Sequence, residues 1–230
     1  MNNLTVIVPF FNEEVYLEKS VNKLLKIKIY DSIILIDNNS SDKSLEVAKN
    51  LAQKNKNIDL YQTDETQGKG VALNLSQNLI TTTHVVIHDA DLEYFPEDIA
   101  EMFSLSKEFP DSMILGSRFI GSKERKNVYK RTYIANKFMS LFFSIVNFYY
   151  VSDVATCYKM MPTKFFQNIY IREQGFSIEI ELLSKFLKYN KSIKELPIKY
   201  SGRSYKEGKK IKFVDGFKYL FNTFKYRFIN

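Results

Sequence analysis

Short apolar runs alternate with amphipathic segments along the first half of the chain. Four of these runs are predicted to be buried strands, because each is brief, rich in aliphatic residues and bounded by polar or turn-forming residues. They are LTVIVPF, SIILID, HVVIHDAD and SMILGSRF.

Helical spacing separates the first three of these strands. Residues 13–28 place Leu17, Val21, Leu24 and Leu25 on one face. A second helix follows the N-cap candidates Ser40, Ser41 and Asp42 and carries Leu45, Ala48, Leu51 and Ala52. GKGVALNLSQNLI predicts a third helix after a glycine-containing entry. This β-α-β-α order predicts an α/β fold with a mostly parallel sheet flanked by helices, and with ligands bound at the carboxyl ends of the strands.

The second half holds two apolar segments of a different kind. Residues 137–151 are almost all apolar but number about 15, fewer than the roughly 20 needed to cross a bilayer. They form either a buried core helix or a helix lying against a membrane. Near the C-terminus, helical spacing aligns Phe213, Phe217, Leu220, Phe221, Phe224 and Phe228, with Lys212, Lys218, Lys225 and Arg227 off or beside that stripe. This is an amphipathic, basic helical tail.

Charge sharpens the interpretation of the tail. The net charge is +7, and the residues from Lys199 onward hold nine Lys or Arg against two acids, so the tail carries the whole excess. A solvated basic helix would explain this charge. Nucleic acid could also attract such a tail, but an anionic membrane surface suits the interleaved aromatic residues better than nucleic acid does. Nucleic acid is not expected as a partner, because no recognition motif accompanies the basic residues.

Length and cysteine content limit the class of protein. We expect one domain over residues 1–230, in three parts: a first half to about 120, a second part over about 121–204 and the tail over about 205–230. The single Cys157 excludes an internal disulfide framework, which favours a reducing compartment. No signal peptide is predicted at the N-terminus. Cys157, His84 and His88 match no nucleophile or zinc spacing and are expected to be structural.

Three acids follow the third predicted strand. Asp89 and Asp91 are two positions apart, which places them on the same side of a regular strand, and Glu93 comes next. Mg²⁺ in proteins commonly takes one or two carboxylates plus phosphate oxygens, so the run fits a metal–diphosphate site. Such spacing is also common by chance, and the alternative role for the acids is to cap the helix predicted to begin near Pro96.

The metal–diphosphate site is better supported when the acids are taken together with other segments of the chain. Six segments occur in a characteristic order: VIVPFFNEE, LIDNNSSDKS, HDADLEY, GSRF, DVATCYK and ELPIKYSGRSYKEGKKI. Together they resemble a family 2 glycosyltransferase of the GT-A fold, in its dolichyl- or polyprenyl-phosphate mannose (glucose) synthase-like branch. The resemblance extends from Val6 to about Arg227. It implies that the half to about residue 120 is the nucleotide-sugar half and that residues from about 121 to 204 form the acceptor half. It implies a Rossmann-like, mostly parallel sheet, an inverting transfer of one sugar, and a divalent cofactor, Mg²⁺ or Mn²⁺.

The resemblance also implies roles for individual residues. Asp91, helped by Glu93, would hold the metal, with Asp89 nearer the sugar. The nucleotide would be bound by Pro9, Phe11, Glu13, Asp37 and Asn38, and the diphosphate by Arg203 and Lys209. The acceptor phosphate would meet Arg118 and Arg131, and Asp153 would belong to the catalytic acceptor side.

Two departures from the family pattern affect these roles. Asn38 replaces a second acid that would accept hydrogen bonds from the base; an amide both donates and accepts, so the choice between GDP and UDP stays open. Glu93 stands where the family often has Gln. Without a nucleotide role, residues 37–40 would still form an Asx-turn into the next helix.

The acceptor decides what catalysis requires. A hydroxyl acceptor needs a general base, whereas a lipid phosphate is already anionic and needs positioning and charge screening. We expect in-line displacement from a nucleotide sugar, GDP-mannose or a UDP-sugar, to a polyprenyl or dolichyl phosphate. The enzyme would be cytoplasmic and peripheral at the cytoplasmic face of a membrane. A membrane-embedded protein is a possible partner. The alternatives are a soluble transferase acting on a glycan or hydroxyl acceptor, with Asp153 or Glu179 as base, and a silent nucleotide-sugar-binding module. The chain has no Trp, which excludes the Q-x-x-R-W signature of processive synthases.

Overall fold

The computed structural model describes residues 3–66, 68–203 and 213–229, with the side chains of residues 213–215 left out. The strands are β1 (Leu4–Phe10), β2 (Ser32–Asp37), β3 (Ile58–Gln62), β4 (His84–Ile87), β5 (Met113–Ser117), β6 (Arg125–Lys126), β7 (Lys159–Pro162), β8 (Ile193–Pro197) and β9 (Tyr200–Ser201). The helices are α1 (Leu17–Ile27), α2 (Ser44–Lys54), α3 (Lys69–Gln77), α4 (Glu97–Glu108), α5 (Lys130–Asn147), α6 (Thr163–Gln167), α7 (Ile178–Tyr189) and α8 (Phe213–Phe224), and a π-helical turn, η2, follows at Lys225–Ile229.

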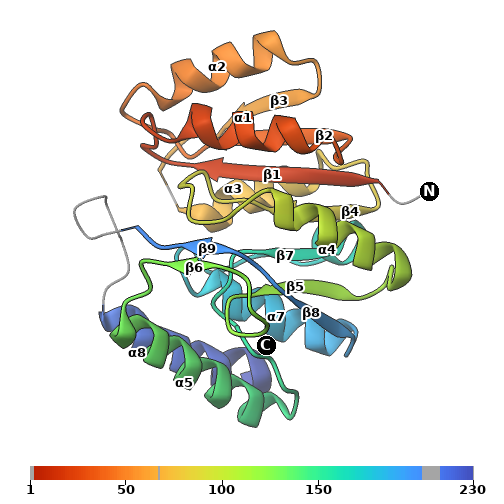
Figure 1. Cartoon of the computed structure of the whole chain (residues 1–230), viewed down its shortest axis with the longest axis vertical. Helices are drawn as coiled ribbons and strands as arrows, with labels where there is room; N and C mark the ends of the chain where they lie inside the picture. Colours follow the sequence, from red (N-terminus) through yellow and green to blue (C-terminus); the bar gives the residue numbers. More distant parts are fainter. Residues whose placement is uncertain (1–2, 67, 204–212, 230) are drawn as a thin grey trace.

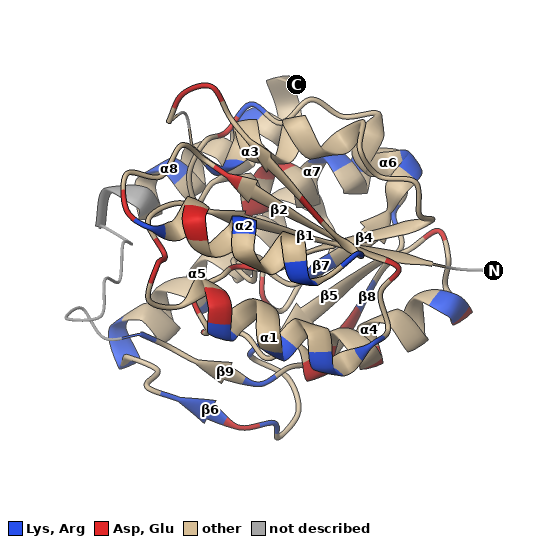
Figure 2. Cartoon of the chain, turned by 90° about the horizontal axis from the view of Figure 1, so that it is seen from above, with Lys and Arg blue, Asp and Glu red and all other residues tan. Residues whose placement is uncertain are grey.

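The main sheet has the strand order β3-β2-β1-β4-β7-β5-β8 and is mostly parallel, as predicted. Its exception is β7, which pairs antiparallel with both β4 and β5. Every residue of β1 is buried, since helices cover both faces of the sheet at its centre. Figures 1 and 2 show α1 and α4 on one side and α3, α6 and α7 on the other.

The carboxyl ends of the parallel strands gather the polar segments. The arrowhead of β1 points to the left in Figure 1, and the register places Phe10 beside Asp37 at the end of β2. The short pair β6–β9 forms a second sheet, and Tyr200 of β9 bridges to Tyr94 in the loop after β4. This bridge brings the end of β9 against the acidic loop after β4.

Some predicted elements differ from the observed ones. The four predicted strands form, but β3, β7 and β8 were not predicted from their short or mixed sequences. Helix α5 begins at Lys130, seven residues before the predicted apolar segment, and ends at Asn147. The predicted tail helix is present as α8 and η2, and its N-terminal residue Lys212 lies outside the described residues.

Helices α5 and α8 pack against each other with their polar sides inward. On α5 the buried residues are Ser140, Phe143, Ser144, Val146 and Asn147; on α8 and η2 they include Tyr219, Asn222, Thr223 and Tyr226. Several large apolar side chains are exposed on the outer side of these helices. We call them the outer apolar surface: Ile134, Phe138, Leu141 and Ile145 of α5, and Phe217, Phe221, Phe224 and Phe228 of α8 and η2.

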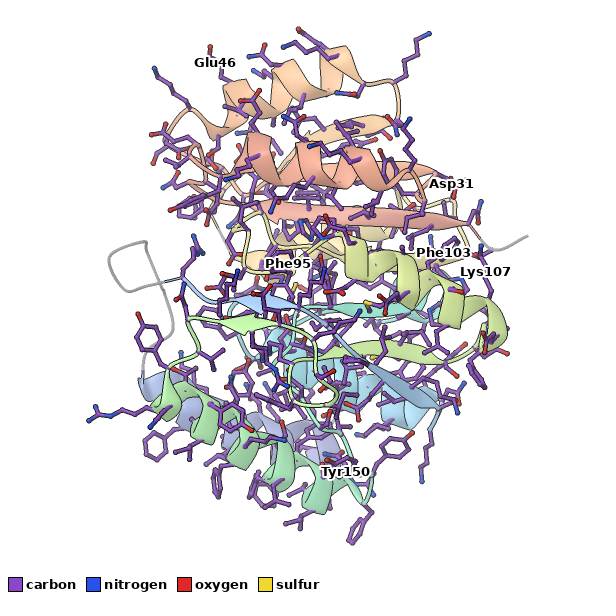
Figure 3. The ribbon with its side chains drawn as sticks, in the orientation of Figure 1. Asp31, Glu46, Phe95, Phe103, Lys107 and Tyr150 are labelled. Carbon is purple, nitrogen blue, oxygen red and sulfur yellow. The ribbon has the colours of Figure 1, made fainter. Side chains whose placement is uncertain are left out.

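Internal hydrogen bonds explain why the polar side can face inward. The Ser140 hydroxyl donates to the Asn136 carbonyl and accepts from the Val154 backbone N–H, and the Tyr219 hydroxyl donates to the Phe176 carbonyl. Polar groups that are paired in this way are buried at little cost. Both helices lie at the lower edge of the molecule in Figure 1, and the neighbouring Tyr150 points away from the sheet in Figure 3. Within the described ranges, no helix is long and apolar enough to span a membrane.

Candidate functional site

The ends of β1 and β2 supply the first predicted site residues. Pro9 is buried and Phe11 half-buried. Asp37 is fully buried, and its two oxygens accept hydrogen bonds from the Ser40 backbone N–H at 3.0 Å and from Gln62 Nε2 at 2.9 Å. The Asx-type turn expected as the alternative therefore forms. Asn38 Oδ1 lies 3.3 Å from the Thr63 hydroxyl, and contact of Asp37 and Asn38 with a nucleotide stays a prediction.

The loop after β4 places Asp89 against a cation that the sequence reasoning missed. Lys69 Nζ, at the start of α3, lies 2.8 Å from Asp89 Oδ1, 3.4 Å from Glu179 Oε1 and 3.7 Å from Cys157 Sγ. Burial alone would raise the pKa of Asp89, but the Lys69 ammonium holds it below the usual value. Asp89 is thus an ionised, positioned carboxylate.

A second missed cation lies behind the first. Lys159 is completely buried in β7, and its Nζ lies 2.5 Å from Glu179 Oε2 and also donates to the Thr156 carbonyl. Asp89, Lys69, Glu179 and Lys159 therefore form a chain of alternating charges from the site into the core. The only sequence signals were the lysines of GKG and DVATCYK, and neither indicates a partner across the fold.

Asp91 and Glu93 both contact Arg203, and binding of a diphosphate by Arg203 stays a prediction. Arg203 Nη2 lies 3.0 Å from Asp91 Oδ2, and Nη1 lies 3.3 Å from Glu13 Oε2. Glu93 accepts from the Arg203 backbone N–H at 2.8 Å and from the Tyr200 hydroxyl at 2.7 Å. We call Glu13, Asp91 and Glu93 the carboxylate cluster.

Crowding of acids changes the proton affinity of this cluster. Burial raises the pKa of Asp91 to about 7, aided by repulsion from Asp89 and Glu93 and opposed by Arg203. A cation placed against Asp91 would relieve this penalty.

The donor set fits a hard divalent cation only with help from phosphate. Carboxylates are the right ligand type, and Arg203 already stands among them as a cation in that position. Across the described residues, no group of three or more potential ligating side chains is arranged to hold a metal. Diphosphate oxygens would complete the coordination around Asp91. Glu93 uses both of its oxygens on Tyr200 and Arg203, so its role as a metal ligand stays a prediction.

Arg118 and Asp153 form a buried bidentate pair. Arg118 Nε lies 2.7 Å from Asp153 Oδ2, and Nη2 lies 2.8 Å from Oδ1; the Arg118 backbone N–H also donates to Oδ2. Burial opposes the charge on Arg118, but Asp153 holds the pKa of the guanidinium well above its ordinary value. With both oxygens engaged, Asp153 fixes Arg118, an arrangement unlike that of a general base.

A pocket opens in front of this pair, and we call it the arginine pocket. It is lined by Arg118, Phe119, Arg125, Asn127, Val128, Tyr129, Thr132, Tyr133, Asn136 and Tyr200. Arg125 comes from β6, which is blue in Figure 2. The predicted phosphate residue Arg131 is exposed on α5 and is not among the lining residues. A second hollow, lined by Arg125, Val128, Lys130, Tyr133 and Ile134, adjoins the first and reaches the outer apolar surface at Ile134.

The remaining predicted residues are placed as follows. Lys209 lies outside the described residues. His88 is buried between the Ser20 and Tyr158 hydroxyls, and His84 is bonded to Thr83 and the Pro110 carbonyl, so both lie in fixed hydrogen-bonded positions. Cys157 is buried, and burial raises the pKa of its thiol, as expected for a packing residue.

Comparison with known proteins identifies the family. The sequence profile of Glycosyl transferase family 2 matches residues 5–170. The chain is 25% identical over 233 residues to a UDP-N-acetylglucosamine–dolichyl-phosphate N-acetylglucosaminyltransferase of Methanococcus voltae, covering 94% of this chain and 92% of that protein. It is 24% identical to a dolichyl-phosphate beta-glucosyltransferase of Trichomonas vaginalis, covering 86% and 65%.

Solved structures agree on the fold. A glucosyl-3-phosphoglycerate synthase of Mycobacterium tuberculosis, crystallised with Mn²⁺, UDP and phosphoglyceric acid, superposes with a TM-score of 0.75 at 15% identity, covering 98% of this chain and 78% of that one. The resemblance to the GT-A fold is thereby confirmed. With the family profile spanning more than half of its length, this chain belongs to glycosyl transferase family 2 and is a glycosyltransferase.

Proposed function

We propose that this glycosyltransferase moves one sugar from a nucleotide sugar, GDP-mannose or a UDP-sugar, to a polyprenyl or dolichyl phosphate at the cytoplasmic face of a membrane. The observation that carries the proposal is the outer apolar surface, which adjoins the arginine pocket. The two dolichyl-phosphate transferase relatives support the same acceptor class.

The donor would lie along the ends of β1, β2 and β4. Asp37, Asn38 and Phe11 would bind base and ribose, and Asp89, whose charge is held by Lys69, would face the sugar. Asp91 would hold Mg²⁺ or Mn²⁺, which supplies charge neutralisation for the departing nucleotide diphosphate. Arg203, with Lys209 as a second cation, would bind that diphosphate.

The acceptor phosphate would enter the arginine pocket. Arg118 is fixed by Asp153, so it presents a charged group without further ordering when a phosphate arrives. Arg125 adds a second guanidinium in the lining, and Arg131 would contribute from the outside. An anionic phosphate oxygen attacks without losing a proton, which agrees with the engagement of both Asp153 oxygens. In-line attack on the anomeric carbon inverts its configuration.

The apolar chain of the acceptor would leave the pocket across Tyr133 and Ile134 toward the outer apolar surface. Fully burying one Phe side chain is worth about 1.5–3 kcal/mol, so four partly exposed Phe residues on α8 and η2 supply several kcal/mol when covered by lipid. Lys130, Arg131 and Lys137 on the first half of α5 suit anionic headgroups.

The test separates lipid from soluble acceptors. Purified protein, Mn²⁺ and a panel of radiolabelled UDP- and GDP-sugars are incubated with vesicles containing a polyprenyl phosphate, or with phosphoglycerate or glycans instead. We expect organic-extractable label that depends on the polyprenyl phosphate, and Asp91→Asn should lower kcat by about 100-fold or more. Label appearing only in water-soluble product would establish the soluble rival. No transfer with any donor, although nucleotide binds, would favour a silent binding module.

Matched variants test the role of the outer apolar surface. Phe138→Ser with Phe221→Ser should abolish sedimentation with anionic vesicles and leave thermal stability unchanged, because these side chains are 57% and 66% exposed. Tyr170→Ser, at a 68% exposed aromatic outside α5 and α8, is the control and should sediment normally. Activity of the purified chain on vesicles would show that no membrane-embedded partner protein is required.

A further inference from the structure

Glu93 anchors the segment that carries Arg203. Its backbone carbonyl accepts from the Ser201 N–H at 2.9 Å, its Oε2 from the Tyr200 hydroxyl, and its Oε1 from the Arg203 N–H. Three hydrogen bonds to Glu93, one each from Tyr200, Ser201 and Arg203, hold the end of β9 against the loop after β4. These bonds hold the backbone at Arg203 in place, so the starting point of its side chain does not depend on the contacts of the guanidinium.

The guanidinium of Arg203 fills the space between acids. It reaches Asp91 and Glu13 and lies 5.5 Å from the centre of the Tyr16 ring, with only 14% of its side chain exposed. Its Nε is buried and finds no hydrogen-bond partner among the described residues, and Glu93 Oε1 is 3.9 Å from it. A buried donor without a partner costs free energy. The guanidinium would therefore be stabilised by moving to an acceptor that also pairs with Nε.

Asp91 cannot contact Arg203 and a divalent cation through the same oxygen at the same time. Its Oδ1 accepts the Glu93 backbone N–H at 3.1 Å, so Oδ2, the atom that Arg203 contacts, is the oxygen pointing into the carboxylate cluster. A metal bound there would place two positive groups within a few ångströms of each other, and like charges so close repel strongly at low dielectric. A diphosphate beside the metal offers the planar guanidinium two anionic oxygens for a bidentate contact instead.

We propose that Arg203 is a built-in competitor of the divalent cation: it occupies Asp91 before the donor arrives, and leaves Asp91 for the diphosphate when metal and nucleotide bind together. The proposal rests on the metal-dependent function proposed above. It makes metal binding weak without nucleotide and couples the two ligands, so the enzyme binds its cation chiefly as part of the donor complex.

Metal binding, measured without any acceptor, tests this. Mn²⁺ affinity is determined by titration calorimetry and by the electron paramagnetic resonance signal of free Mn²⁺, with protein alone and with saturating UDP or GDP. Without nucleotide, Arg203→Gln should bind Mn²⁺ about tenfold more tightly than the unaltered protein, which corresponds to about 1.4 kcal/mol. Lys56→Gln is the matched control; it removes one charge from an exposed residue just before β3, at the opposite end of the sheet, and should leave Mn²⁺ affinity unchanged.

Saturating nucleotide should reverse the order of Mn²⁺ affinity between the unaltered protein and Arg203→Gln. It should tighten Mn²⁺ binding strongly in the unaltered protein and much less in Arg203→Gln, which lacks the diphosphate contact. Arg203→Lys keeps the charge but cannot span two carboxylates, and should fall between the two. If Arg203→Gln, folded by circular dichroism, binds Mn²⁺ no more tightly than the unaltered protein without nucleotide, the competition is refuted. Failure of sugar transfer with normal Mn²⁺ binding would instead refute the proposed function and leave the competition standing.

Discussion

Replacing Asp153 by Asn tests whether the buried pair with Arg118 holds in solution. Asp153 is fully buried, and both of its oxygens accept hydrogen bonds from the Arg118 guanidinium. The amide removes the negative charge and turns two N–H donors toward a group that only donates. Removing one partner of a buried ion pair costs about 3–5 kcal/mol, since the remaining charge is left without compensation in a poorly solvated position.

That cost is large against a typical total stability of about 5–15 kcal/mol. For a chain of this size it corresponds to a fall in Tm of roughly 6–20 °C. The assay is urea unfolding followed by circular dichroism, in which the midpoint should fall by roughly 1–2 M with the slope m unchanged.

The double variant Arg118→Met with Asp153→Leu separates packing from function. Replacing both charges by apolar groups of similar size should recover much of the stability lost in Asp153→Asn. It should recover no transferase activity, because the phosphate-binding guanidinium is gone. An unfolding free energy for Asp153→Asn within about 0.5 kcal/mol of the unaltered protein, the range of ordinary surface substitutions, would refute the reasoning.

Two further predictions concern the scaffold of the site. Burial lowers the pKa of His88, which is bonded to the Tyr158 hydroxyl, from 6.5 to about 4. Between these pH values the unfolded chain binds the proton and the folded chain does not, so up to about 3 kcal/mol of stability should be lost as pH falls from 6.5 to 4. His88→Gln should flatten this dependence in urea unfolding measured at several pH values. Gly70→Ala would bring its Cβ within 2.1 Å of the Glu173 carbonyl oxygen and should cost about 1–3 kcal/mol. Gly175→Ala, with no heavy atom within 4 Å, should stay within about 0.5 kcal/mol, and equal thermal melting of these two variants would contradict the close packing of α3 on that loop.

Local pattern was sufficient for the central half of the fold. The runs that form β1, β2, β4 and β5 are apolar throughout because helices cover them on both faces, and such runs are recognisable from composition. Placement of Asp89 and Asp91 at a strand end followed from the same pattern, since an apolar run that stops at acids marks the edge of a core. The six ordered segments added the family and the expected roles.

Other elements carry too little local signal. Strand β7 has four residues, one of them a lysine, and lies antiparallel between β4 and β5 only because the chain returns there after α5. Lys159 looks like a surface residue in the sequence, yet it is completely buried because Glu179, twenty positions away, neutralises it.

The sequence by itself determined the parallel sheet, the edge where the acids gather, the family and the apolar stripe on the tail, because each depends on residues close together in the chain. Only the tertiary structure decided that Lys69 and Arg203 meet Asp89 and Asp91, and that α5 and α8 bury Ser, Asn and Thr side chains while most of their Phe side chains face outward. Helical periodicity reveals that a stripe exists, but which side faces the core depends on partners that other segments supply.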